Sequence, residues 1–209
     1  VVRGVDHDLY AGECVGLVGD NAAGKSTLTK VLAGTYIADA GTIALDGEPV
    51  RFSGPADART RGIEMVYQDL SLCDTIDVTG NLFLGREITR AGFLDRATMV
   101  RHAREMLAGL GIRIPNLSAN VEMLSGGQRQ SIAIARAASF KPRVLIMDEP
   151  TSALAVAEVE AVLALIDRVK ASGVAVVLIT HRLQDLFRVC DRIAVMYEGL
   201  KVAEGRTTA

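Results

Sequence analysis

Short apolar runs alternate with helical patterns along most of the chain. The apolar runs of strand length are residues 13–18, 63–67, 144–147, 174–179 and 192–196. The helical patterns between them are residues 25–33, 55–61 and 156–170. Alternation of this kind is typical of an α/β fold with a largely parallel sheet. We therefore expect an α/β core.

The middle of the chain, from about residue 69 to residue 141, has few strand patterns and mostly helical ones. Asp95 is placed to cap a helix over residues 96–110, and Gly111 lies just past its end. Ser125 precedes a second helix over residues 127–139. These patterns predict a helical subdomain inserted into the core of a single domain. The expected boundaries are residues 69–141 for the helical subdomain and residues 1–68 and 142–209 for the core.

Two turn signals predict hairpins. Asp46-Gly47 lies between extended stretches at residues 42–45 and 49–52, and Glu198-Gly199 follows the last strand. We therefore expect an antiparallel β edge beside the parallel strands.

Length and composition are those of an ordinary globular protein. The chain has 209 residues, of which 49% are hydrophobic and 23% are charged, enough for one core with a smaller inserted lobe. The net charge of −2 excludes a global basic field for nucleic acid or anionic membranes. No apolar run approaches the roughly 18 residues that a membrane span needs, and no signal peptide is visible. If the protein works at a membrane, another chain must hold it there.

The three cysteines do not have the spacing of a disulfide framework or a zinc site. Cys14, Cys73 and Cys190 are far apart in the sequence and form no C-x-x-C pair, so neither a zinc site nor a disulfide framework is expected. A reducing, cytoplasmic location is then the default. Because the chain starts at Val1 without a methionine and stops soon after Arg206, we expect it to be trimmed at both ends.

A glycine-rich stretch after the first strand matches the pattern G-x4-G-K-[ST] in full. Glycines let several backbone N–H groups point at phosphate oxygens, and the helix that follows adds its positive N-terminal end. Lys25 is placed to reach the β- and γ-phosphates, and the Ser26 hydroxyl is placed to ligate Mg2+. A chance glycine-rich turn fits poorly with a strand before the loop and a helix after it. The residues of the expected phosphate site are Gly19, Asp20, Asn21, Ala22, Ala23, Gly24, Lys25, Ser26 and Thr27.

Two acidic residues, Asp148 and Glu149, follow directly after the apolar run at residues 144–147. Burying a carboxylate is unfavourable unless a cation or a proton is nearby. Asp148 and Glu149 therefore indicate a site that binds a metal ion or transfers a proton. Asp148 suits the Mg2+ shell, held through water, and Glu149 suits a general base that polarises the attacking water. An acidic turn after a strand is common by itself, but the glycine loop upstream makes that interpretation weak.

A third motif stands between these two and indicates the family. Its residues are Leu124, Ser125, Gly126, Gly127 and Gln128. On these residues the chain resembles the ABC ATPases, which implies a P-loop core of the ABC ATPase type. Ser125 and the two glycines open a helix N-terminus, which is a second anion site. The resemblance implies that ATP is the nucleotide. It also implies a head-to-tail dimer, in which each signature motif closes on the γ-phosphate held by the other subunit's loop.

Two further residues gain a role only through the resemblance. Gln68 follows the run at residues 63–67, where the family has a glutamine that touches Mg2+ and the attacking water. His181 follows residues 174–180, at the place where the family has a histidine that contacts the γ-phosphate and orients the base. Without the resemblance, each would be an ordinary loop residue.

Two positions depart from the family pattern. Ala155 stands in the crossing loop, residues 152–155, where the family normally has an aspartate that links the two ATP sites of the dimer. The family also stacks adenine on an aromatic residue upstream of the glycine loop. Tyr10 is too close to the loop for that role, so we expect the stacking position before Val1 and a packing role for Tyr10.

The resemblance covers essentially the whole chain and favours solute transport. The stretch from Gln68 to Leu124 is far too short for the coiled coil of the chromosome-maintenance ATPases, and one cassette rather than two argues against the translation-factor branch. No T-E-V-G-like motif of the exporters precedes the signature, which favours import. Residues 66–74 and 81–87, together with Ala155, resemble the ATP-binding subunits of bacterial monosaccharide importers for ribose, xylose, fructose or galactose.

That resemblance implies a set of partners. They are a second ATP-binding subunit, transmembrane permease subunits that dock near residues 68–84, and indirectly a periplasmic or extracellular solute-binding protein. No nucleic acid is expected, and the protein would be peripheral on the cytoplasmic face of the membrane. Two alternatives stay open: a soluble ABC ATPase that acts on nucleic acid or ribosomes, and a nucleotide switch that binds ATP without hydrolysing it.

Overall fold

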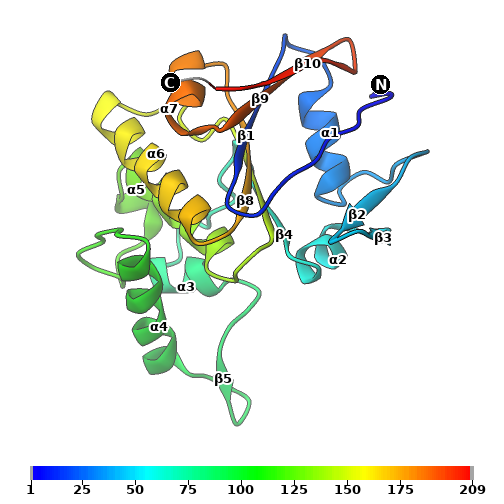
Figure 1. The fold of residues 1–209 in the computed structure, drawn as a ribbon. Helices are drawn as coiled ribbons and strands as arrows, with labels where there is room; N and C mark the ends of the chain where they lie inside the picture. Colours follow the sequence, from blue (N-terminus) through cyan, green and yellow to red (C-terminus); the bar gives the residue numbers. More distant parts are fainter. Residues whose placement is uncertain (1, 208–209) are drawn as a thin grey trace.

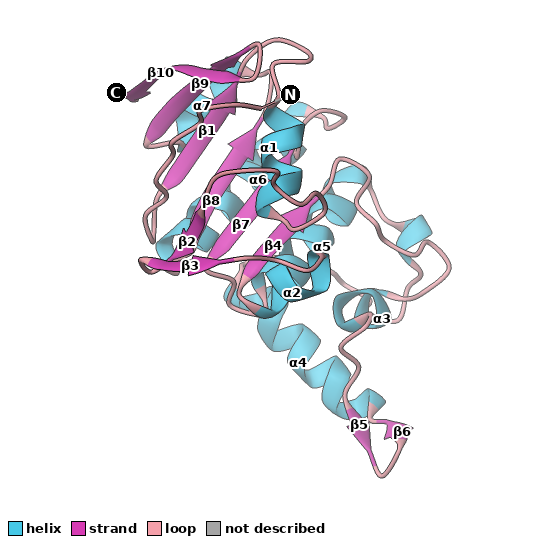
Figure 2. Cartoon of the chain, turned by 90° about the vertical axis from the view of Figure 1, so that its right-hand side faces the viewer, coloured by secondary structure: helices cyan, strands magenta, loops and turns pink. Residues whose placement is uncertain are grey.

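The computed structural model describes residues 2–207. Its centre is a six-stranded sheet in the order β10-β9-β1-β8-β7-β4. The strands are β1 (Cys14–Val18), β4 (Ile63–Val66), β7 (Val144–Asp148), β8 (Ala175–Ile179), β9 (Arg192–Tyr197) and β10 (Leu200–Arg206). All neighbours pair in parallel except β10, which pairs antiparallel to β9 (Figure 2). The expected parallel core with an antiparallel edge is confirmed.

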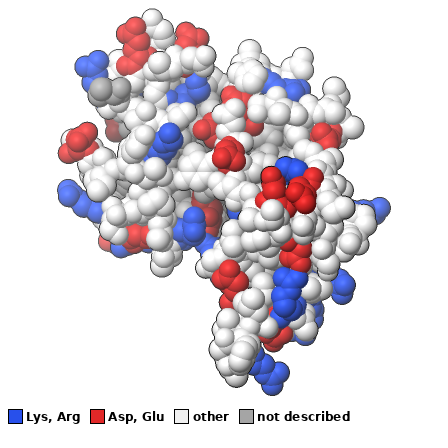
Figure 3. Space-filling view, turned by 180° about the vertical axis from the view of Figure 1, so that it is seen from behind, with Lys and Arg blue, Asp and Glu red and all other residues white. Residues whose placement is uncertain are grey.

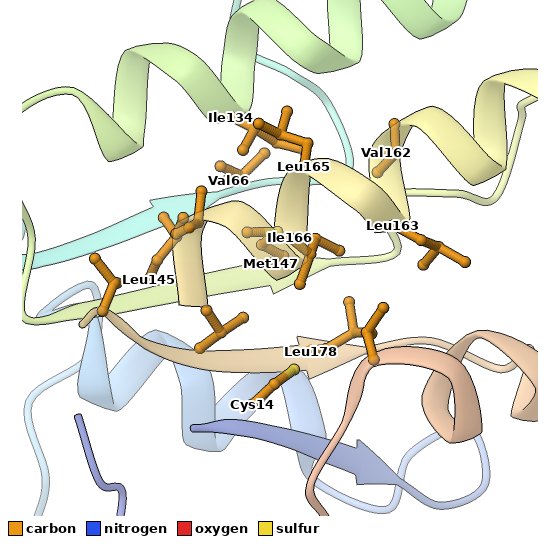
Figure 4. Close-up of a cluster of buried hydrophobic side chains, with 14 of the residues drawn as sticks. Cys14, Val66, Ile134, Leu145, Met147, Val162, Leu163, Leu165, Ile166 and Leu178 are labelled. Atoms are coloured by element: carbon orange, nitrogen blue, oxygen red, sulfur yellow. The ribbon is translucent and has the colours of Figure 1, made fainter. Parts of the chain in front are cut away.

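Helices cover both faces of this sheet. Alternate side chains of each strand point to opposite faces, so the helices bury apolar side chains on both. Ile146 of β7 belongs to a cluster with residues of α1 (Lys25–Leu32) and α2 (Pro55–Thr60). Leu145 and Met147, on either side of it, pack with α5 (Gly126–Ala138), α6 (Val156–Ala171) and α7 (Leu183–Val189) (Figure 4). A strand that is buried on both faces must be apolar throughout, which explains the uninterrupted apolar runs in the sequence.

A helical lobe extends from one end of the sheet (Figure 1). It consists of α3 (Val78–Phe83), α4 (Arg96–Gly109), the short 3-10 helix η1 (Val121–Met123) and α5. Ile132 and Ala135 of α5 pack into the lobe, whereas Ala133 and Ile134 of the same helix pack against the sheet. Because α5 contributes to both clusters, the division of the chain at residues 68/69 and 141/142 stays a prediction.

The expected elements are present, with ends displaced by one or two residues. Asp95 caps α4 by accepting from the Thr98 amide at 3.0 Å, as expected for this position. Ser125 caps α5 in the same way. The hairpin at Asp46-Gly47 joins β2 (Ile43–Leu45) to β3 (Glu48–Val50).

Besides the 3-10 helix η1, two helices and one hairpin of the described residues were not expected from the sequence. They are α3, α7 and a small hairpin of β5 (Thr89–Arg90) and β6 (Phe93–Leu94). The two helices are six and seven residues long, which is too short for a helical period to stand out. The hairpin has two residues in each strand and lies inside the stretch where strand signals fade.

Cysteines that are distant in sequence meet in the core. Cys14 of β1 and Cys190, the residue after α7, are buried free thiols whose sulfur atoms are 3.5 Å apart. The hydrogen bond that they share and their burial raise the pKa of Cys14 well above its usual value. The sequence spacing gave no sign of this pair. Among the described residues, no helix is long and apolar enough to cross a bilayer.

Candidate functional site

The glycine-rich loop links the end of β1 to the start of α1, on the edge where the parallel strands end. Gly19 and Gly24 adopt φ values of 150° and 96°, in the region that side chains rarely tolerate. A Cβ on Gly19 would lie 2.1 Å from the backbone oxygen of Met196 in β9. The loop therefore requires glycine for its conformation and for its close approach to the neighbouring strand.

Lys25 places a positive charge over this loop. Its Nζ donates to the backbone oxygens of Gly19, at 2.6 Å, and Asp20, at 2.9 Å. The loop residues 19–22 are exposed, and so is Ser26 on the first turn of α1. A phosphate chain that entered the loop would meet the ammonium group, the start of α1 and the Ser26 hydroxyl together. The loop therefore fits the nucleotide phosphates.

Asp148 ends β7, two strands away from β1 in the sheet. Partial burial raises the pKa of this carboxyl above its ordinary value, and the charges of Lys30 and Lys25 oppose the shift. Lys25 of the loop is therefore close enough to act on the charge of this carboxyl group. A half-buried carboxyl group of this kind suits a cation, since a bound cation would favour its charged form. Ser26, Gln68 and Asp148 offer the oxygen donors that Mg2+ prefers.

Glu149 is held by both its backbone and its side chain. Its φ of 52° is uncommon for a residue with a side chain, and its amide donates to the Ile179 oxygen of β8 at 2.8 Å. Its Oε2 lies 2.9 Å from Nδ1 of His181, which follows β8. The Glu149 side chain is mostly covered, whereas the His181 side chain is 72% exposed. The covered carboxylate therefore meets an imidazole ring that solvent and ligands can reach.

Gln68 follows β4, and β4 pairs in parallel with β7 through Val66 and Met147. The residue is exposed and lies on the same edge of the sheet as the two acids. The loop after it is fastened to the signature helix, because Arg136 of α5 donates to the backbone oxygens of Ser71 at 2.8 Å and Leu70 at 3.0 Å.

The signature motif lies apart from these residues. Its helix α5 packs on the face of the sheet opposite to α1. Ser125 and Gln128 form a capping box: the Ser125 oxygen accepts from the Gln128 amide, and the Gln128 side chain accepts from the Ser125 amide. The chain thus brings the glycine loop, Asp148, Glu149, His181 and Gln68 to one edge of the sheet. It does not bring Ser125, Gly126, Gly127 and Gln128 to the same place.

One residue at the signature was missed by the sequence analysis. Glu158 of α6 accepts from the Ser125 hydroxyl at 2.9 Å and from the Gly127 amide at 3.1 Å through Oε1. Its Oε2 accepts from the Ala155 amide at 3.2 Å. Only the last contact had a sequence signal, since an acid three residues after a helix start is a capping pattern.

Comparisons with known proteins identify the family and the fold of the chain. The family model described as ABC transporter matches residues 2–152. The chain is 48% identical over 198 residues to the fructose import ATP-binding protein FrcA of Rhizobium meliloti, covering 91% of this chain and 76% of the relative. It is 44% identical to the xylose/arabinose import ATP-binding protein XylG of Sulfolobus acidocaldarius, covering 94% and 78%. The ribose import ATP-binding protein RbsA of Chromobacterium violaceum is 43% identical, and the match spans 98% of this chain but 41% of that relative.

Solved structures share the fold. MJ1267, an ATP-binding cassette of an ABC transporter, superposes with a TM-score of 0.86 at 27% identity, over 98% of this chain and 85% of that one. The ATP-binding cassette MJ0796, seen as a dimer in a post-hydrolysis state with ADP and Pi, superposes with a TM-score of 0.82 at 23% identity, over 100% and 91%.

Proposed function

The chain belongs to the ABC transporter family as an ATP-binding subunit that hydrolyses ATP to power transport, and from this premise we propose that it drives uptake of a monosaccharide. The observation that carries the proposal is the gathering of Lys25, Asp148, Glu149 and His181 at one edge of the sheet. The relatives named for fructose, xylose/arabinose and ribose import supply the class of solute. The membrane partners would select the sugar itself.

We assign the phosphates of ATP to residues 19–27. Lys25 would exchange its two backbone acceptors for phosphate oxygens, which are stronger partners because they are charged. Mg2+ held by Ser26, Gln68 and Asp148 would neutralise charge that develops on the phosphates. These residues would hold the nucleotide with its terminal phosphate toward Glu149.

Glu149 would accept the proton of the attacking water. Its hydrogen bond to His181 fixes the carboxylate in one direction, because both partners follow adjacent parallel strands. The exposed imidazole ring is free to meet the γ-phosphate, which links the presence of that phosphate to the position of the base. Gln68 at the end of β4 would complete the water site.

The signature would act in trans. Since α5 and α1 cover opposite faces of the sheet, the donors of Ser125, Gly126, Gly127 and Gln128 cannot serve the loop of their own chain. A two-fold head-to-tail dimer supplies each loop with the signature of the other subunit. Two ATP molecules would then lie between the subunits.

The permease would dock where the helical lobe meets the core. A cleft of about 410 Å³ lies next to the expected docking segment, residues 68–84, and is lined by Gly85 and by residues that include Arg59, Glu64, Arg86 and Phe140. Arg86 is ion-paired with Glu64, and its guanidinium carbon lies 3.9 Å from the centre of the Phe140 ring, so paired charges line the cleft. A solute-binding protein on the other side of the membrane would complete the transporter. The subunit would sit on the cytoplasmic face of the membrane.

Copurification from detergent-solubilised membranes tests this function directly. A tagged chain should recover a protein with several membrane spans, and the complex should hydrolyse ATP faster when a solute-binding protein loaded with sugar is added. ATPase stimulation by DNA or RNA without any membrane partner would contradict the proposal.

On the face shown in Figure 3, acidic and basic side chains are interspersed, and no continuous basic area is present there for nucleic acid to bind.

A further inference from the structure

One carboxylate joins the starts of two helices. Glu158 of α6 accepts three hydrogen bonds, from the Ser125 hydroxyl, the Gly127 amide and the Ala155 amide. The first two donors belong to the N-terminus of α5 and the third to the start of α6. Both helices therefore direct the positive ends of their backbone dipoles at the same anion.

The start of α5 is shaped around this side chain. A Cβ on Gly127 would lie 2.8 Å from Cβ and Cγ of Glu158 and 2.9 Å from its Cδ. A side chain at position 127 would therefore displace Glu158. The three hydrogen bonds lower the pKa of the Glu158 carboxyl, so the group is an anion at neutral pH.

The same donors have a second use under the proposed function. The γ-phosphate of the partner's ATP needs the Ser125 hydroxyl and the amides that follow it, and Glu158 holds the hydroxyl and the Gly127 amide. Two anions cannot share these donors without strong repulsion. Room exists for the carboxylate to leave, because Ser125, Gly127, Gln128 and Glu158 line an open cleft of about 370 Å³.

We propose that Glu158 occupies the phosphate-binding donors of the signature in the separated subunit and must vacate them before the partner's ATP binds. Glu158 thereby sets how tightly two ATP-loaded subunits associate. When Glu158 leaves, the Ala155 amide also loses its acceptor. The change therefore includes the crossing loop, where Ala155 stands in place of the usual aspartate. This inference rests on the proposed function.

The test uses the chain with Glu149→Gln, in which the proposed function predicts that the ATP-bound dimer accumulates. Sedimentation at increasing protein concentration, with saturating MgATP, gives the dimer dissociation constant with and without Glu158→Gln. The amide keeps the size of the side chain but removes the charge that competes with phosphate. We expect a dimer about tenfold tighter, which corresponds to about 1.4 kcal/mol, and an unchanged affinity of the monomer for ATP. Glu160→Gln, an exposed glutamate on the same helix, is the matched control and should change neither value.

The sign of the effect separates competition from a purely structural role. If Glu158 only stabilised the two helix starts, Glu158→Gln would weaken the dimer or leave it unchanged, and either result would overturn the inference. A dimer that responds to ATP in Glu149→Gln but not to the change at Glu158 contradicts the inference alone. If Glu149→Gln forms no ATP-dependent dimer, the proposed function is contradicted, and the inference with it.

Discussion

Nδ1 of His181 lies 2.9 Å from Oε2 of Glu149, although the two residues are 32 positions apart in the chain. They meet because β7 and β8 are adjacent and parallel, with Asp148 paired to Ile179. Glu149 follows the first strand and His181 lies just beyond the second. The pair therefore depends on the register of the sheet.

Glu149→Gln should leave ATP binding intact and lower the rate of hydrolysis at least about a hundredfold, because an amide cannot take the proton of water. Steady-state phosphate release and nucleotide titration measure the two quantities. Glu160→Gln is the control at an exposed position of similar charge. Rapid turnover in Glu149→Gln would remove Glu149 from the assigned role.

His181→Ala should lower the turnover rate more than it lowers the affinity for ATP, because the ring orients Glu149 in addition to meeting the γ-phosphate. If the two side chains act as a unit, the double variant with Glu149→Gln should lose little more than Glu149→Gln alone. The rates of the two single variants and the double variant provide the test. Effects that multiply independently would mean that the hydrogen bond does not orient the base.

Lys25→Ala should weaken nucleotide binding itself, by about ten- to a hundredfold, since a charge-assisted hydrogen bond contributes about 1.5–3 kcal/mol. Titration with a fluorescent ATP analogue measures the change. Lys141→Ala, at an exposed lysine, is the control. Unchanged affinity in Lys25→Ala would contradict the phosphate site at residues 19–27.

Asp148→Asn should raise the melting temperature of the nucleotide-free protein at pH 7. Burial raises the pKa of Asp148, so its charged form destabilises the fold, and this cost appears as the pH rises through the folded pKa. Below the unfolded pKa, about 4, the carboxyl is neutral in both states and the difference should vanish. The same variant should weaken Mg2+-dependent ATP binding. A lower melting temperature at pH 7 would show that the charge is stabilised by its surroundings.

Gly127→Ala should destabilise the protein by about 1–3 kcal/mol, because the added methyl group overlaps Glu158. Gly126→Ala is a close control, since its methyl group would lie 3.4 Å from Leu154 Cδ2. Urea unfolding of both variants measures the difference. Equal stability of the two would mean that Glu158 moves away from Gly127 at no cost.

Local motifs explain why the site could be predicted in large part from the sequence. The glycine loop, the acids after β7 and the signature each consist of consecutive residues, so their backbone geometry follows from short-range constraints on a strand, a turn and a helix start. The uninterrupted apolar runs also indicated a parallel sheet, because a strand covered on both faces needs apolar side chains at every position. The short helix α7 escaped detection because most of its stability comes from packing against α6 and the sheet.

Contacts between distant segments were decided only by the tertiary structure. Cys14 and Cys190 meet in the core, and Glu158 reaches Ser125 across 33 positions, because helix packing and strand order bring those segments together. The sequence determined that the chain has a phosphate loop, two acids and a signature. The fold decided that the loop and the acids share one edge of the sheet, and that the signature lies on the opposite face with its donors already bound to a carboxylate. The physical reason is that motif chemistry depends on neighbours along the backbone, whereas these contacts depend on which elements pack together.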